Sequence, residues 1–385
     1  MDPLATPPPP TLTELFWLPS QMYILWATIV FFHGLLFGSF FNVAIYRVPA
    51  GLSVSKPKRS FCFRCGSQIR WYENLPVLSW FILGGRCGRC GAPFSLRYAG
   101  IEFLTGLIFL AVFVGTNPFG SPSFDPATIW YLAFASLLIV GTFTDLDHWI
   151  IPDGVTVYGT VAALVAAAGL GAYGGYTLLT EFGPFPIVRL HGGQDPFSVF
   201  VMLMQGPDRL EIDPATLLPW EPFANALIGA GFGWLMLYSV GVAGKVIARK
   251  DAMGYGDVKL FTMIGATLGA TGALATFIIA CGLGTLIGGG PMIIRRGRAL
   301  LDAMRGIKRP PASTLLQEGL ELFPLEEGDA SAPGAVVRRH RVWFEEHGAP
   351  APMHHMPFGP SIAMGALVVV IFQHPLREVM ARWIL

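Results

Sequence analysis

Long hydrophobic runs alternate with polar stretches rich in glycine and proline along the whole chain. A helix that crosses a bilayer needs about 20 consecutive, mostly apolar residues. We predict eight such spans, at 22–46, 100–115, 127–143, 155–172, 223–247, 258–270, 272–294 and 358–372. The sixth is short for a span and could instead be a re-entrant segment. The pattern predicts an all-α polytopic membrane protein.

The composition supports this fold class. Of the 385 residues, 53% are hydrophobic and only 13% are charged, whereas a soluble domain carries about 25% charged residues. This excludes a disordered chain, a collagen and an ordinary cytosolic globule. The net charge of +1 provides no basic field that would attract nucleic acid.

The lysine and arginine residues predict an orientation. With the amino terminus outside the cell, three inner segments, 47–97, 245–259 and 295–341, hold 22 of the 26 basic residues, as the positive-inside rule requires. We therefore expect a multi-pass membrane protein with an extracytoplasmic amino terminus. The expected segments are an outer tail (1–21), a first span (22–46), a cytosolic lobe (47–99), spans two to four (100–172), an outer insertion (173–221), spans five to seven (222–294), a cytosolic insertion (295–357) and the last span with its tail (358–385).

Four of the five cysteines form two C-x-x-C-G pairs within the predicted cytosolic lobe. The pairs are separated by 21 residues and comprise Cys62, Cys65, Cys87 and Cys90. Two such pairs can place four thiolates in a tetrahedron around one ion, which is the coordination of a structural zinc site. Disulfides are the alternative, but the predicted cytosolic location disfavours them. Because four thiolates leave no open coordination position, zinc here would fold the lobe and take no part in chemistry.

Acidic residues at the membrane edge are the candidate catalytic groups, because ionisable residues near spans are costly and usually functional. Asp145 follows the third span, and Asp257 precedes the sixth within Gly254-Tyr-Gly-Asp. Gly254 and Gly256 would let the backbone, and a substrate strand, approach closely. Asp147 is expected to be a solvated helix end or to play a supporting role, and Asp153 is expected to be a helix N-cap.

The predicted topology brings Asp145 and Asp257 to the same membrane face from separate helices. Two carboxyl groups a few ångström apart cannot both ionise easily, so they share a proton. The ionised group can then take a proton from water while the protonated group polarises a peptide carbonyl. This is the chemistry of an aspartyl protease.

The motifs, taken in order, resemble those of the type IV prepilin peptidase family, whose aspartate motif GxGD is shared with presenilin-like intramembrane proteases. The similar stretches are FGSFFNVAIYRVP at 37–49, the cysteine pairs with WYENLPVLSW at 71–80 between them, Arg97, Tyr98 and Glu102, DLDHWIIPD at 145–153, GYGD at 254–257 and MPFGP at 356–360. The resemblance implies that Asp145 and Asp257 are the catalytic pair. It also implies a location in a bacterial inner membrane, and cleavage of prepilins and pilin-like secretion proteins after a leader glycine at the cytoplasmic face of that membrane.

The resemblance carries further expectations and two departures. Members with the cysteine lobe usually also methylate the new amino terminus with S-adenosylmethionine, whose site the sequence does not place. The two aspartates are 112 positions apart, wider than usual, because segment 173–221 intervenes. The long segment before residue 356 is also unusual, and it could contact pilus or type II secretion assembly components. Expected partners are thus prepilin or pseudopilin substrates and the lipid bilayer, with no nucleic acid.

The resemblance leaves open a peptidase that has lost methylation, and two further alternatives remain from the residues alone. The first is a transporter that uses the membrane-edge carboxylates as a proton relay. The second is a zinc-containing scaffold whose aspartates only cap helices.

Overall fold

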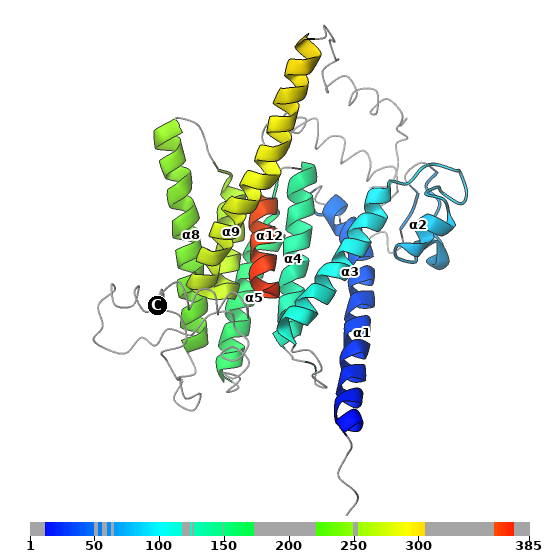
Figure 1. Ribbon diagram of the computed structural model, residues 1–385, viewed down its shortest axis with the longest axis horizontal. Coiled ribbons are helices and arrows are strands. Elements are labelled where there is room, and N and C mark those ends of the chain that lie inside the picture. Colours follow the sequence, from blue (N-terminus) through cyan, green and yellow to red (C-terminus); the bar gives the residue numbers. More distant parts are fainter. Residues whose placement is uncertain are drawn as a thin grey trace, which may run out of the picture.

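The computed structural model describes residues 12–49, 53–55, 60–62, 65–117, 124, 127–148, 150–172, 221–248, 253–304 and 358–372. These residues are mostly helical, with two isolated β-bridges and no longer strand. Figure 1 shows the helices as a bundle with a small lobe beside one end. The elements are α1 (Leu12–Arg47), η1 (Trp71–Asn74), α2 (Leu78–Ile82), α3 (Leu96–Thr116), α4 (Ala127–His148), α5 (Asp153–Ala172), α8 (Glu221–Ala248), α9 (Tyr255–Met304) and α12 (Gly359–Ile371).

Five helical segments in the described part of the chain are long and apolar enough to cross a membrane: Gln21–Arg47, Leu96–Thr116, Thr128–His148, Phe223–Ile247 and Tyr255–Leu286. Two shorter apolar helices cover Asp153–Gly169 and Gly359–Ile371. The predicted fourth and eighth spans therefore correspond to the shorter helices, and the predicted sixth and seventh spans both lie within α9. The expected all-α membrane architecture is confirmed.

α9 is interrupted at Gly269, where φ is 72° and ψ is 177°. The packing against α12 shows that the chain reverses there. A Cβ built on Gly359 would approach Asp257, near the start of α9, and a Cβ on Gly284 would lie 3.5 Å from the Ser361 hydroxyl. The start of α9 and residue 284 therefore lie at the same level of α12. Because φ near +70° favours glycine, the reversal depends on the residue type at this position.

Two apolar clusters hold the bundle together. The larger joins α4, α9 and α12 and includes the fully buried Leu138, Phe261 and Val369. The smaller joins α1, α3 and α4 around Phe41 and Phe109. α12 packs against α9, α4 and α3 and lies within the bundle (Figure 1), so its amino-terminal end is surrounded by other helices.

Several element boundaries differ from the predictions. α1 begins ten residues before the predicted first span, and α9 continues to Met304, beyond the predicted span end at 294. α4 continues to His148, so Asp145 lies inside a helix and not after it. The sequence also suggests strand-like runs at 185–190 and 197–203 and a short helix at 313–322, and all three lie outside the described residues.

Candidate active site and metal site

Asp145 lies in the last turns of α4, on the face that points into the bundle. Only 6% of its surface is exposed. Its Oδ2 atom is buried and has no hydrogen-bond partner within the described residues. Buried polar atoms are rarely left without partners, so this oxygen is a candidate to hold a proton or to bind water or substrate.

Asp257 lies in the first turn of α9. Its backbone N–H donates to the carbonyl of Gly254 at 3.2 Å, which fixes the turn that leads into the helix. A Cβ on Gly254 or Gly256 would find its nearest neighbours at 3.8 Å and 3.5 Å, which are ordinary contacts. The chain's own packing therefore does not require glycine at either position, and a close approach of substrate there stays a prediction.

The two carboxyl groups meet at Gly359, the first residue of α12. An ideal Cβ at this glycine would lie 2.5 Å from Asp145 Oδ2 and 3.2 Å from Asp257 Oδ1. Because both distances start from one point, the two oxygens lie within about 6 Å of each other. The expectation that Asp145 and Asp257 come together is confirmed.

Gly359 itself was not singled out from the sequence. It forms part of the MPFGP stretch at 356–360. This stretch contributed to the family resemblance, but no function was assigned to any of its residues. The Gly-Pro step at the start of an apolar run was the available signal. In the structure, the first residue of α12 is a glycine that lies beside both carboxyl groups, where a side chain would not fit.

The other two aspartates near the site form ion pairs. Asp147 Oδ2 accepts from Arg97 of α3 at 2.6 Å, and Asp153 Oδ1 accepts from Lys259 of α9 at 2.6 Å. Asp147 thus points away from the pair formed by Asp145 and Asp257, because residues two positions apart lie on different faces of a helix. Asp153 is the first residue of α5, and its recorded side-chain partner is Lys259, so it joins α5 to α9 where we expected only an N-cap.

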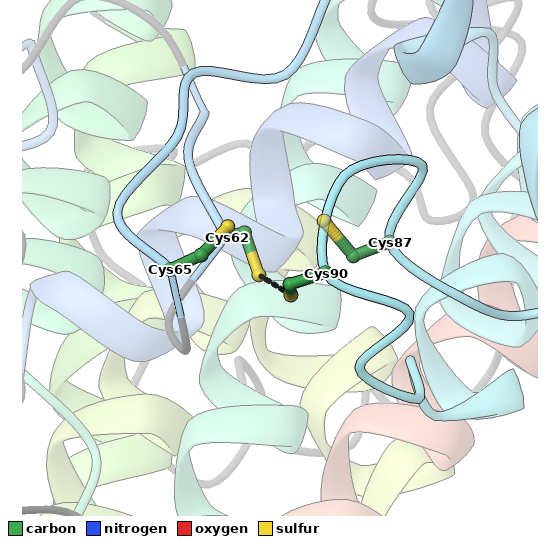
Figure 2. Close-up of side chains that lie close together, drawn as sticks. All are labelled: Cys62, Cys65, Cys87 and Cys90. Atoms are coloured by element: carbon green, nitrogen blue, oxygen red, sulfur yellow. Dashed lines mark hydrogen bonds between the residues drawn. The ribbon is translucent and has the colours of Figure 1, made fainter.

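The four cysteines of the lobe gather at one point, as predicted. All four sulfurs lie within 4.8 Å of one another, and Cys62 Sγ is 3.7 Å from Cys90 Sγ. Figure 2 shows the side chains coming from two separate loops toward a common space. Zinc–sulfur bonds of about 2.3 Å place tetrahedral sulfurs about 3.8 Å apart, so the cluster fits a metal ion.

Both cysteine loops use the same backbone turn. The N–H of Gly66 donates to the Cys62 carbonyl at 2.8 Å, and the N–H of Gly91 donates to the Cys87 carbonyl at 2.9 Å. These glycines have φ of 67° and 68°, a region that side chains disfavour. The glycine that ends each C-x-x-C-G motif therefore lets the backbone turn beside the cysteines.

The thiols of this lobe are prepared for ionisation. Hydrogen bonds from the Ser67 side chain and backbone lower the pKa of Cys65 to about 6, and backbone bonds from Cys90 and Arg89 lower the pKa of Cys87. Since thiolates are the metal-binding form, these bonds favour metal binding.

Comparison with known proteins settles the family. Residues 32–116 match the bacterial peptidase A24 N-terminal domain, and residues 197–289 match the type IV leader peptidase family. A prepilin leader peptidase/N-methyltransferase of Myxococcus xanthus (strain DK1622) is 31% identical over 372 residues, covering 92% of each chain. The chain belongs to the type IV leader peptidase family.

Other members of this family are similar over less of the chain. A protein of the same description from Klebsiella pneumoniae is 30% identical over 68% of this chain and 93% of its own, and one from Aeromonas hydrophila is 30% identical over 70% and 83%. No solved structure matches significantly. Asp257 lies within the matched leader peptidase segment, and Asp145 lies between the two matched segments. These relatives give no support to a transporter.

Proposed function

We propose that this protein is a membrane aspartyl endopeptidase that removes the leader peptide of type IV prepilins and pilin-like secretion proteins. It also methylates the new amino terminus with S-adenosylmethionine. Family membership supports both activities, since its relatives are named prepilin leader peptidase/N-methyltransferase. The observation that carries the peptidase is the convergence of Asp145 and Asp257 at Gly359.

The two carboxyl groups act as a general acid–base pair. One is ionised and takes a proton from the attacking water, while the other is protonated and donates a hydrogen bond to the peptide carbonyl. The buried Asp145 Oδ2, without a partner in the described chain, suits either role. Because the two groups titrate as a unit, the roles belong to the pair.

The position of the pair suits a substrate with an apolar helix and a basic leader. Asp145 lies near the end of α4 and Asp257 near the start of α9, both at the end of the bundle that carries the cysteine lobe. We place this end at the cytoplasmic membrane face and the amino terminus outside. A prepilin helix could then lie in the bilayer with its leader at the anionic inner surface, which would align the scissile bond.

The cysteine cluster would hold a structural zinc ion through its four thiolates. A bound zinc ion would supply a crosslink between the two loops, which are otherwise joined by few apolar contacts. In the proposed topology, segments 1–21 and 173–221 lie outside the cell, and segments 47–99 and 295–357 lie in the cytosol. Contacts between the cytosolic insertion at 295–357 and pilus or type II secretion components belong to the same proposal.

A prepilin cleavage assay with acid-to-amide variants tests the peptidase. Asp145→Asn and Asp257→Asn should each lower cleavage by at least about a thousandfold, because neither the base nor the proton donor can be replaced by an amide. Asp147→Asn and Asp153→Asn remove only partly exposed ion pairs, which contribute about 0–1 kcal/mol, and should cleave at nearly the normal rate. Intact cleavage by Asp257→Asn would disprove the proposed mechanism.

A further inference from the structure

A cavity lies between the lobe and the adjoining ends of α1 and α3. It is partly open to solvent and has a volume of about 160 Å³. Its walls come from α1, η1, α2, α3 and both cysteine loops. Of the described residues, none from α4, α9 or α12 lines it, so it is separate from the aspartate pair.

Two carboxylates line this cavity and are held in place by backbone groups. Glu102 Oε2 accepts from the N–H of Val77 at 2.7 Å, and Glu73 Oε2 accepts from the N–H of Arg70 at 2.9 Å. The Glu73 Oε1 atom also lies against Gly88, where a Cβ would approach it to 2.8 Å. Both side chains are partly buried, and partly buried acids with fixed orientation suit an ammonium group or a pair of hydroxyls.

The backbone that fixes Glu102 is strained. Val77 has φ of 63° and ψ of −51°, and it is the one described residue other than glycine with a positive φ. This conformation is unfavourable for a β-branched residue, and such strain concentrates at binding and active sites. Here the strained N–H points at a carboxylate of the cavity wall, which ties the strain to the cavity.

The rest of the lining complements an aromatic, cationic amino-acid ligand. Trp80 has its ring packed on Gly85 and donates its indole N–H to the Phe94 carbonyl at 3.1 Å. Tyr98 adds another aromatic ring, and Arg47, Arg86 and Arg89 add positive charge to the lining. Aromatic rings can stack on a base or face a sulfonium cation, and a guanidinium can bind a carboxylate.

We propose that this cavity binds S-adenosylmethionine. Glu73 and Glu102 together take the ribose hydroxyls and the ammonium group, while Trp80 and Tyr98 together contact the adenine and the sulfonium. The inference rests on the proposed methylation, and it assigns the methyl donor to residues that the sequence alone does not single out for it.

The cavity and the aspartate pair lie at the same end of the bundle. Arg97 of α3, next to Tyr98 of the cavity wall, forms the 2.6 Å ion pair with Asp147 of α4, two residues from Asp145. The new terminal amine, in its neutral form, attacks the methyl carbon. The carbon–nitrogen bond forms as the carbon–sulfur bond breaks, its electrons neutralise the sulfonium, and the amine releases one proton to water.

Photochemical crosslinking to the intact wild-type enzyme tests the location directly. The purified, zinc-loaded protein is irradiated with S-adenosylmethionine tritiated in the methyl group, and labelled peptides are mapped by mass spectrometry. We expect label within 67–102, and excess unlabelled S-adenosylmethionine should suppress it. Label confined to another part of the chain would overturn the inference.

Calorimetric titration supplies the energetic test, with leader cleavage as the check on folding. Glu102→Gln should weaken S-adenosylmethionine binding at least tenfold, because one charged hydrogen-bond acceptor is lost, whereas Asp153→Asn should bind as the wild type does. Unchanged binding by Glu102→Gln would contradict the inference. If the variant neither binds nor cleaves, it is misfolded and the crosslinking map decides.

Two further outcomes separate this inference from the proposed function. If the wild type binds no S-adenosylmethionine and leaves processed pilin unmethylated, the proposed methylation fails and the inference fails with it. The second outcome is that methylation occurs, and that a synthetic leader peptide prevents labelling of 67–102 whereas S-adenosylhomocysteine does not. The cavity is then a site for the leader, and only the inference is wrong.

Discussion

At the scale of single residues, Gly359 determines how closely the two acids can approach. Any side chain here would intrude between them, since even a Cβ would lie 2.5 Å from Asp145 Oδ2, well inside van der Waals contact. Gly359→Ala should therefore lower prepilin cleavage by about a hundredfold, the effect expected when catalytic groups move by about 1 Å. The measurement is the initial rate of leader removal in detergent or proteoliposomes.

A matched glycine provides the control for this variant. Gly282 lies in α9, and a Cβ added there meets nothing within 4 Å. Gly282→Ala should cleave normally. Full activity in Gly359→Ala would show that the acids do not need the space that this glycine leaves.

The cysteine loops give a prediction for pH. The hydrogen bonds from Ser67 lower the pKa of the Cys65 thiol to about 6 from its ordinary value of 9.0, so above pH 6 this thiol is mostly ionised and below it protons compete with metal. Ser67→Ala removes the side-chain bond and should raise the pKa of Cys65. Bound zinc should then be lost at a higher pH, as followed with a colorimetric zinc chelator.

The exposed Ser55 serves as the comparison for Ser67. Its hydroxyl contacts Ser53 and no cysteine, so Ser55→Ala should leave the zinc-release curve unchanged. Identical curves for Ser67→Ala and the wild type would contradict the assignment of this bond.

At the scale of elements, close helix packing positions Asp257. Gly229, Gly231 and Gly233 recur at every second position of the sequence and predict close helix packing along α8, and the structure supports this prediction at two of them. A Cβ at Gly229 would collide with the carbonyl of Gly265 on α9, and one at Gly233 would lie 2.6 Å from the Phe261 carbonyl. Gly231 faces open space, so the expectation was wrong there, because residues two apart lie on different faces of a helix.

This difference gives a paired test on one helix. Gly229→Ala should destabilise the protein by about 1–3 kcal/mol through overpacking and should also slow cleavage, because α9 carries Asp257. Gly231→Ala should be neutral or slightly stabilising, since alanine favours helices by up to about 1 kcal/mol. Thermal unfolding in detergent compares the two, and equal midpoints would refute the packing argument.

At the scale of the whole molecule, the proposed orientation places the lobe inside the cell and the amino terminus outside. The distribution of lysine and arginine supports it. An epitope tag after residue 2 should be accessible to antibody on intact spheroplasts, whereas a tag within 56–59 should become accessible only after permeabilisation. The reverse pattern would move the acids to the outer face and end the proposal of cytoplasmic cleavage.

The sequence by itself predicted the fold class. It also identified Asp145 and Asp257 as the candidate catalytic acids and four cysteines as the candidate metal ligands. In a bilayer, an apolar run of this length forms a helix because the helix hydrogen-bonds all its own backbone groups. Paired C-x-x-C-G motifs are typical of metal sites. The motifs around Asp145 and Asp257, in their order along the chain, indicate the family. These signals are local in the chain, so they can be read without a three-dimensional structure.

Only the tertiary structure decided how distant segments meet. It brought Gly359, more than 100 positions after Asp257, between the acids, and it showed that Gly269 reverses α9 so that α12 can reach this point. It also assembled the cavity of Glu73 and Glu102 from several elements. The physical reason is that a close approach depends on which helix faces pack together, and a glycine that permits close packing does not specify which other helix it will meet.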